Sequence, residues 1–292
     1  MTIWNLGSIN IDHFYRLPHL PAPGETLAAD SYAMGLGGKG ANQSVAAVRA
    51  GARVYHIGGV GPEGWALERL QSFGVDCRYV ERCADAGGHA IISVDKAGEN
   101  AIVLFAGANR AFGFAGVEAA LQKAVPGDTL LLQNETAHQA QAAELARAKG
   151  MRVIYSAAPF DVEAVRAVLP HITLLVLNAV EAAQLSQALG LALDKLLVPQ
   201  VLVTRGSDGA EWHDLASGEA VRQAAFAVDV VDTTGAGDTF AGYFAAARDA
   251  SQPPAEALRL ASAAAALKVT RSGTADAIPA RAEVEAFLKS RV

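Results

Sequence analysis

Four short runs in the second half of the chain constrain its fold most: residues 129–132, 152–155, 173–177 and 201–204. Each of the first three precedes a segment with helical periodicity, at 136–149, 162–168 and 179–189. The runs are largely apolar and do not alternate with polar residues, which is typical of strands buried on both faces. Strands of this kind, alternating with helices, predict a parallel sheet that is covered by helices on each side.

The first half of the chain contains further strands and helices, together with segments that do not fit the predicted parallel sheet. Residues 3–6 and 54–57 read as further strands, and 40–50 and 63–73 as helices. Two hairpin-like strands, 89–94 and 101–105, do not suit a buried parallel sheet. Neither does an irregular proline-rich segment, 12–34, which could be a loop or a twisted hairpin. We expect residues of about 11–34 and 89–105 to form a small β-cover over one edge of a single domain spanning 1–292. The chain closes with a hairpin near 212–221 and helices at 239–250, 255–270 and 281–289.

Composition excludes several classes of protein. About half of the 292 residues are hydrophobic (51%), the formal net charge is -6, and no basic stripe is found, so nucleic acid is not expected as a partner. The two cysteines make no disulfide framework, and no signal peptide or membrane-spanning run is read. We therefore expect a cytoplasmic protein that has no membrane partner.

The segment Val231–Phe240 carries the strongest chemical signal. A turn of small residues, Gly235-Ala236-Gly237, begins an apolar helix and places Asp238 at the start of that helix. The free N–H groups and the positive dipole end of a helix start favour an anion. A carboxylate beside an anion cradle suits phosphoryl transfer, with Asp238 as the base that accepts a proton. The alternative is that Asp238 only caps the helix.

A second glycine-rich segment, Gly35–Gln43, precedes the helix predicted at 40–50. It matches GxGxxG literally, but the next strand ends without the acid that a dinucleotide site needs, and Gly40 stands where a Walker A motif has Ser or Thr. The segment presents Lys39 and Asn42 at a helix start, where they could hold the hydroxyls of a polyol. The alternative is an ordinary glycine-rich turn.

Polar residues also follow several predicted strands, where open α/β sheets usually bind ligands. Asn10 and Asp12 follow the first strand, and Glu135 follows the strand at 129–132. Asn178 and Glu181 lie three residues apart at a helix start, where they could orient water on Mg²⁺ or simply cap the helix. The turn 204–209 could wrap a nucleotide or only reverse the chain.

Taken together, these segments resemble the ribokinase-like carbohydrate kinases, the pfkB family, and among them the ribose kinases most closely. The resemblance runs nearly end to end and rests on five segments: Gly7–Asp12, Pro23–Thr26, Gly37–Gln43, Ala106–Asn109 and Asp232–Phe240. It implies a three-layer α/β/α sandwich with a small β-sheet lid. It also implies an ATP-dependent kinase that phosphorylates the primary hydroxyl of a pentose, D-ribose to ribose 5-phosphate, and a homodimer formed through the lid.

The resemblance assigns roles by position. Sugar-binding residues would be Asn10, Asp12, Gly38, Lys39, Asn42 and Glu135, with Asp238 as the base and Gly235, Ala236 and Gly237 as an anion hole. The nucleotide and Mg²⁺ would contact Asn178, Glu181, Thr204, Gly206, Ser207, Gly209, Gly237 and Ser262. A monovalent cation, K⁺, would lie behind the anion hole at Asp232, Thr234, Lys268, Arg271, Gly273 and Ala277, several of them acting through backbone carbonyls.

The chain departs from the family pattern at three places. Ala277 stands where the family has Ser, Ser156–Pro159 replaces an Asn-Pro-x-Pro pattern, and Phe105 differs from the usual lid residue. Other acceptors, such as 2-deoxyribose, fructose or a nucleoside, are therefore kept as alternatives. A non-catalytic sugar-binding relative and a nucleotide-cofactor oxidoreductase are weaker ones.

Overall fold

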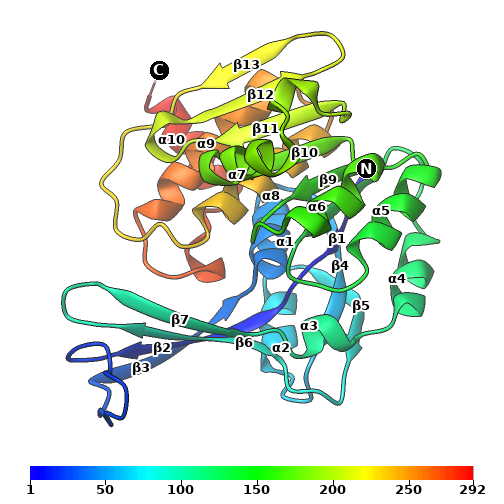
Figure 1. Cartoon of the computed structure of the whole chain (residues 1–292). Coiled ribbons are helices and arrows are strands. Elements are labelled where there is room, and N and C mark those ends of the chain that lie inside the picture. The colour runs from blue at the N-terminus through cyan, green and yellow to red at the C-terminus, as the bar shows by residue number, and fades with distance from the viewer. Residues whose placement is uncertain (292) are drawn as a thin grey trace.

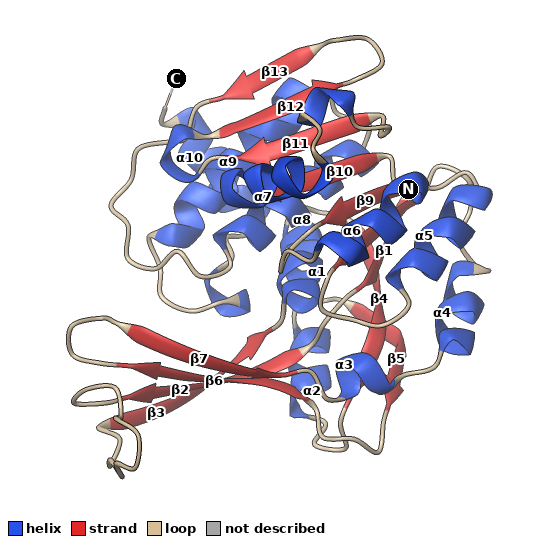
Figure 2. Cartoon of the chain, in the orientation of Figure 1, coloured by secondary structure: helices blue, strands red, loops and turns tan. Residues whose placement is uncertain are grey.

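The computed structural model of the protein describes residues 1–291 and contains two β-sheets of different kinds (Figures 1 and 2). The main sheet has nine strands, in the spatial order β13 (Ala220–Gln223), β12 (Ala210–Asp214), β11 (Gln200–Thr204), β10 (Leu174–Asn178), β9 (Arg152–Ser156), β8 (Thr129–Gln133), β1 (Thr2–Leu6), β4 (Arg53–Val60) and β5 (Asp76–Arg82). From β11 to β5 all neighbours are parallel, while β12 and β13 add an antiparallel edge. The predicted parallel sheet is therefore confirmed.

Helices cover both faces of this sheet. One face carries α1 (Lys39–Arg49), α2 (Trp65–Ser72), α8 (Ala236–Asp249), α9 (Pro254–Val269) and α10 (Arg281–Lys289). The other carries α4 (Phe114–Leu121), α5 (Gln139–Ala148), α6 (Val162–Val168) and α7 (Ala179–Leu189). The short helix α3 (Ala108–Ala111) and the 3₁₀ turns η1 (Leu169–His171), η2 (Leu193–Lys195), η3 (Gly206–Asp208) and η4 (Ala275–Ala277) complete the described chain. In residues 1–291 no helix is both long and apolar enough to cross a bilayer.

The two cores explain why the central strands read as continuous apolar runs. In β1, Ile3 packs into the core beneath α1 and α8, whereas Trp4 packs into the core on the opposite face. In β8, Leu131 points to the first core and Leu130 to the second. Successive side chains of a strand point to opposite faces, so a strand covered on both sides is largely apolar. Two buried polar exceptions, Asn5 in β1 and Gln133 in β8, are hydrogen-bonded to each other.

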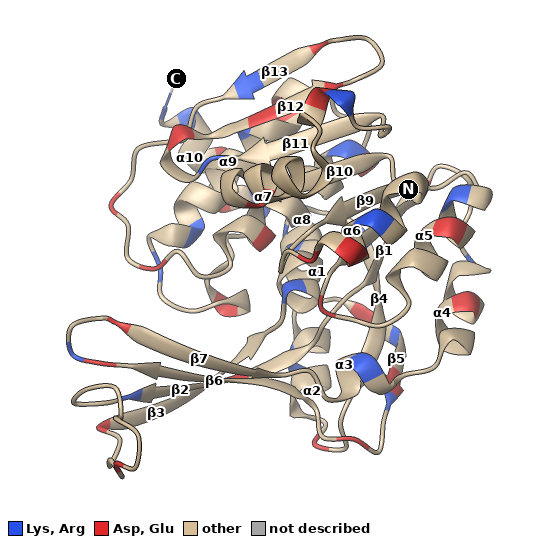
Figure 3. Cartoon of the chain, viewed as in Figure 1, with Lys and Arg blue, Asp and Glu red and all other residues tan. Residues whose placement is uncertain are grey.

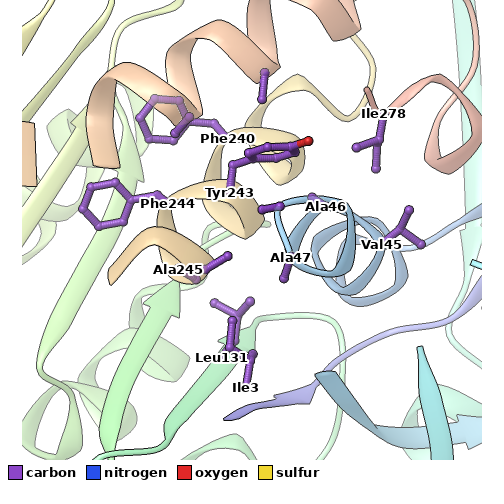
Figure 4. Close-up of a cluster of buried hydrophobic side chains, with 14 of the residues drawn as sticks. Ile3, Val45, Ala46, Ala47, Leu131, Phe240, Tyr243, Phe244, Ala245 and Ile278 are labelled. Carbon is purple, nitrogen blue, oxygen red and sulfur yellow. The ribbon is translucent and has the colours of Figure 1, made fainter. Parts of the chain in front are cut away.

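Helices α1 and α8 cross unusually closely on one face of the sheet. Ala46 and Ala47 of α1 face Tyr243 and Ala245 of α8 above Ile3 and Leu131 (Figure 4). Gly242 makes this possible, since a Cβ there would lie 2.5 Å from both the Ala46 Cβ and the Gln43 carbonyl oxygen. The small residues of both helices therefore let the first turn of α1 reach the first turn of α8.

The second sheet projects from the main body as a curved ribbon (Figure 1). Its four strands, here called the lid, are β3 (Ser31–Gly37), β2 (Asn10–Arg16), β6 (Gly88–Val94) and β7 (Asn100–Phe105). The two ends of segment 12–34 lie in the antiparallel strands β2 and β3, and its prolines lie in the long connection between them, so the hairpin alternative is confirmed. The lid begins four residues after β1 ends, so its base lies at the carboxyl edge of the main sheet.

The strand order changes direction beside β1. On one side the chain continues outward through β4 and β5, and on the other it continues through β8, β9, β10 and β11. Crossovers leaving in opposite directions create a crevice at the carboxyl ends of the central strands, which is where open α/β sheets bind ligands. The residues that follow β1 and β8 therefore meet at the base of the lid.

Candidate active site

Asp238 lies in the first turn of α8, where this helix packs against α1. The N-cap of α8 is Gly235, with φ of 72°, so the alternative that Asp238 caps the helix is wrong. Its carboxylate instead accepts hydrogen bonds from Asn42 Nδ2 at 3.2 Å and Gln43 Nε2 at 3.0 Å, both from the first turns of α1. Asp238 is 8% exposed. Two amides thus fix the orientation of a largely buried carboxylate.

Gln43 connects Asp238 to a chain of buried polar groups that sequence reasoning did not identify. Gln43 Oε1 accepts from Gln133 Nε2 at 2.8 Å, and the same Gln133 amide donates to Asn5 Oδ1 at 2.9 Å. Asn5 in turn donates to Ser44 Oγ, which lies 2.8 Å from His56 Nδ1. Burial lowers the pKa of His56 to about 4, so this imidazole is neutral at ordinary pH. The network holds the Gln43 amide with its N–H toward Asp238.

Asp12 in the lid strand β2 lies within electrostatic reach of Glu135 and Asp238 and is 5% exposed. It is packed against the backbone of β3, because a Cβ at Gly37 would lie 2.0 Å from Asp12 Oδ2. Burial raises the pKa of Asp12 to about 7, and the charges of Glu135 and Asp238 act in the same direction. The site therefore contains a carboxylate that is costly to keep ionised without a partner.

The other predicted sugar-site residues surround Asp12 and Asp238. Asn109 Nδ2 donates to Asn10 Oδ1 at 2.7 Å and so orients that amide. Glu135, following β8, accepts from Ser8 Oγ and from the backbone N–H of Lys39, the residue after Gly38, at 3.1 Å.

Two groups of this cluster could interact with a polar ligand: the Lys39 ammonium and the side-chain oxygen of Asn42. The Asp238 carboxylate raises the pKa of Lys39, with smaller contributions from Glu135 and Glu181, so Lys39 is a cation among acids. Asn42 Oδ1 is buried and has no hydrogen-bond partner within residues 1–291. Buried acceptors are rarely left unpaired, so this oxygen requires a donor from a bound molecule or water.

A cavity of about 550 Å³ lies on the other side of the α8 N-terminus. Of the eight residues predicted for the nucleotide, six line it: Thr204, Gly206, Ser207, Gly209, Gly237 and Ser262. The lining that the sequence did not identify is mostly apolar and includes Phe226, Val228, Val230, Phe240 and Val269. Ser262 Oγ is buried and unpaired within the described part of the chain. Gly237 borders the cavity directly before Asp238.

Asn178 and Glu181 are not part of that cavity lining. They form a capping box at the start of α7, in which Glu181 N–H donates to Asn178 Oδ1 at 2.9 Å and Asn178 N–H donates to Glu181 Oε2 at 2.8 Å. The capping alternative is therefore realised. Burial raises the pKa of Glu181, and Asp238 adds to this, while Asn178 N–H and Lys39 oppose it. Glu181 still belongs electrostatically to the cluster around Asp238.

The positions predicted for a monovalent cation are only partly brought together. Asp232 accepts from Thr234 N–H and from Gly273 N–H, each at 2.9 Å, and its carbonyl accepts from Lys268 Nζ at 3.0 Å. The Arg271 guanidinium is directed to Glu283 instead, at 2.6 Å. Ala277 lies in η4, where its N–H donates to the Thr274 carbonyl at 3.1 Å.

Comparisons with known proteins agree with this geometry. The family described as pfkB family carbohydrate kinase matches residues 3–281. A ribokinase of Haemophilus influenzae is 34% identical over 304 residues, covering 99% of this chain and 98% of its own length. A deoxyribokinase of Salmonella typhimurium is 30% identical and covers 99% of both chains.

Solved structures show the same architecture. The structure of an Arabidopsis thaliana ribokinase complexed with ribose and ATP superposes with a TM-score of 0.88 at 31% identity. It covers 99% of this chain and 98% of the other. The main sheet, its helices and the lid therefore belong to a known arrangement.

The raised pKa of Asp12 predicts a pH-dependent stability. Between the ordinary pKa of 3.8 and about 7, the folded protein keeps a proton that the unfolded chain has lost, so stability falls as pH rises. The full difference corresponds to at most roughly 4 kcal/mol. Urea unfolding of the ligand-free protein from pH 5 to 8 should show this decline, and Asp12→Asn should flatten it. An equal slope in both proteins would contradict the assignment.

Proposed function

We propose, because the chain belongs to the pfkB family of carbohydrate kinases, that it transfers the γ-phosphoryl group of ATP to the primary hydroxyl of D-ribose. One observation carries the proposal most directly. Asp238 is held by two amides at the N-terminus of α8, with a nucleotide-sized cavity on one side and a cluster of sugar-binding side chains on the other. A carboxylate in that position lies between donor and acceptor.

The sugar would bind to the polar cluster at the base of the lid. Asp12, Asn10 and Glu135 offer acceptors for hydroxyl groups, while Lys39 offers a donor. The orphaned Asn42 Oδ1 is supporting evidence, because a sugar hydroxyl would supply the donor that this atom lacks. Hydroxyl donors would also compensate the ionised form of Asp12.

Asp238 would accept the proton of the attacking hydroxyl as the new O–P bond forms. General-base help of this kind typically contributes about 10²–10⁴-fold to the rate. The N–H groups at the start of α8, at Gly235 and Gly237, would stabilise the charge that spreads over the phosphoryl oxygens. The Ala236 N–H, which donates to the Thr233 carbonyl at 3.1 Å, would have to be shared with the phosphate. Closure of the lid would exclude water, the competing acceptor.

The adenine nucleotide would occupy the 550 Å³ cavity, whose apolar walls suit a base and whose unpaired Ser262 Oγ offers a polar contact. Residues 1–291 contain no group of three or more His, Cys, Asp or Glu that could hold a metal alone. Mg²⁺ suits such a site, because it usually takes one or two carboxylates together with substrate phosphates. Glu181 is the carboxylate we assign to it, and bound Mg²⁺ would neutralise phosphate charge.

The predicted monovalent cation does not suit the residues present. Lys268 places an ammonium against Asp232, the acidic residue of the expected site. Ala277 has no side-chain oxygen to contribute. We therefore derive no step that depends on K⁺.

A panel of acceptors tests the proposed reaction. With ATP and Mg²⁺, coupled detection of ADP should show the highest kcat/KM with D-ribose, compared with 2-deoxyribose, fructose and adenosine. Asp238→Asn should lower kcat by about 10²–10⁴-fold, since the amide cannot accept the proton. ATP affinity, measured by calorimetry, should be nearly unchanged in that variant.

The panel also separates the alternatives. Preference for 2-deoxyribose or a nucleoside would reassign the acceptor within the same family. Absence of ADP release with every acceptor would favour a non-catalytic sugar-binding protein. Turnover of Asp238→Asn equal to that of the unaltered enzyme would refute the role of this carboxylate.

We also propose that the lid pairs with the lid of a second copy to form a homodimer. Strand β7 is an edge of the lid and carries no charged residue (Figure 3). Its side chains Ile102, Val103, Leu104 and Phe105 are 50–67% exposed. Apolar edge strands readily pair with another chain, and burying this one would remove a continuous apolar surface from water.

Light scattering during size-exclusion chromatography tests the dimer. The 30.2 kDa chain should elute at twice this mass, and Val103→Asp should elute as a monomer because a charge would be buried in the interface. Leu197→Asp, which adds the same charge at a 96% exposed apolar position outside the lid, should remain dimeric. A monomeric unaltered protein, or a dimeric Val103→Asp, would contradict the proposal.

A further inference from the structure

Lys268 is a fully buried lysine for which the proposed reaction has no role. Its side chain, in the last turn of α9, is 0% exposed. The ammonium donates to the Asp232 carbonyl at 3.0 Å and lies 3.8 Å from Asp232 Oδ2. A buried charge is strongly destabilising unless it is paired and hydrogen-bonded. Lys268 therefore has a specific electrostatic partner rather than a solvated head group.

Asp232 links Lys268 to the anion hole. Its two carboxylate oxygens accept from Thr234 N–H and Gly273 N–H, and its own N–H donates to the Val269 carbonyl at 3.1 Å. Burial would raise the pKa of Asp232, but these donors and the charge of Lys268 outweigh it and lower the pKa. The carboxylate is therefore anionic. It holds the segment that ends, three residues later, at the α8 N-cap Gly235.

This is the position at which the family resemblance implies a monovalent cation. Any cation bound to Asp232 would be a close neighbour of Lys268 Nζ. Two like charges held this close together in a protein repel each other strongly. Lys268 itself is among the positions expected to hold the cation, and its carbonyl already accepts from Arg271 N–H at 3.0 Å. The Lys268 ammonium thus supplies the positive charge that a bound cation would give to Asp232, and it disfavours the binding of a second cation there.

We propose that the Lys268 ammonium is a built-in replacement for the monovalent cation, holding Asp232 and the loop that leads to the anion hole. Lys268 is a positioning residue, since it acts on the anion hole through Asp232 and not on the substrate. The enzyme therefore needs no K⁺ for its structure or its turnover. The turnover part rests on the proposed function, whereas the binding of K⁺ can be tested without it.

Thermal unfolding measures the cation response directly. We compare the unaltered protein, Lys268→Ala, Lys268→Met and the exposed control Lys289→Met in KCl and in tetramethylammonium chloride of equal ionic strength. The unaltered protein and Lys289→Met should have the same unfolding midpoint in both salts. Lys268→Ala opens space for an ion and should gain stability in KCl only, because a ligand that binds the folded state stabilises it. Lys268→Met keeps the volume without the charge and should not respond.

ADP release with ribose gives the second readout. Turnover of the unaltered enzyme should be equal in the two salts. Lys268→Ala should lose about ten-fold or more in kcat without K⁺, as when an anion-hole contact is lost, and recover with KCl in a saturable way. A purely structural lysine would not show this rescue.

Two results would overturn the proposal: a K⁺-dependent rise in midpoint or turnover of the unaltered protein, or a Lys268→Ala variant that K⁺ does not rescue. Should Lys268→Ala fail to fold, the response of the unaltered protein alone still decides. Loss of all ADP release, with the salt responses of the midpoints as expected, would refute the proposed reaction and leave the role of Lys268 intact.

Discussion

The close crossing of α1 and α8 is the contact on which the candidate site depends. Gly242 has no room for a Cβ, because the Gln43 carbonyl and Ala46 Cβ already occupy that position at 2.5 Å. Side chains cannot separate the helices at this point, so the amides in the first turns of α1 reach the carboxylate in the first turn of α8. Gly242 lies one helical turn after Asp238. The distance between the helices at Gly242 therefore determines whether the amides of α1 can reach the Asp238 carboxylate.

The charges around Asp238 have a consistent arrangement. Four carboxylates lie near the ammonium of Lys39: those of Asp12, Glu135, Glu181 and Asp238. The pKa shifts of Asp12, Glu181 and Lys39 reflect this excess of acid. Hydroxyl donors from a sugar and a bound Mg²⁺ would both relieve it. On the far side of α8, the Asp232–Lys268 pair provides the charge balance within the protein itself.

Much of the fold could be predicted because its signals are local. Helices at 162–168 and 179–189 end where predicted, since Asp161 caps the first and the Asn178–Glu181 box and Gly190 bound the second. Strand β5 was not predicted, because this edge strand is partly exposed and has a polar sequence. Helix α4 was also missed, since Gly116 and few polar residues obscure its periodicity.

The site was predictable to a lesser degree. The residues after β1 and β8 could be placed because parallel strands end at one edge. The hydrogen bonds that Asp238 accepts from Asn42 and Gln43 could not be predicted, since these residues lie 196 and 195 positions away in the sequence and meet Asp238 only through helix packing. The position of the Lys268 side chain was likewise hidden, because Lys268 lies 36 positions from Asp232 in the sequence and meets it only in the folded chain.

Replacing Gly242 tests the central claim most directly. Gly242→Ala should push α8 away from α1, costing about 1–3 kcal/mol of stability, and should lower kcat while KM for ATP is retained. Gly116→Ala, on the exposed face of α4, should be neutral or slightly stabilising and fully active. If Gly242→Ala turns over ribose as fast as the unaltered enzyme, the contact between these helices does not position Asp238, and the account is wrong.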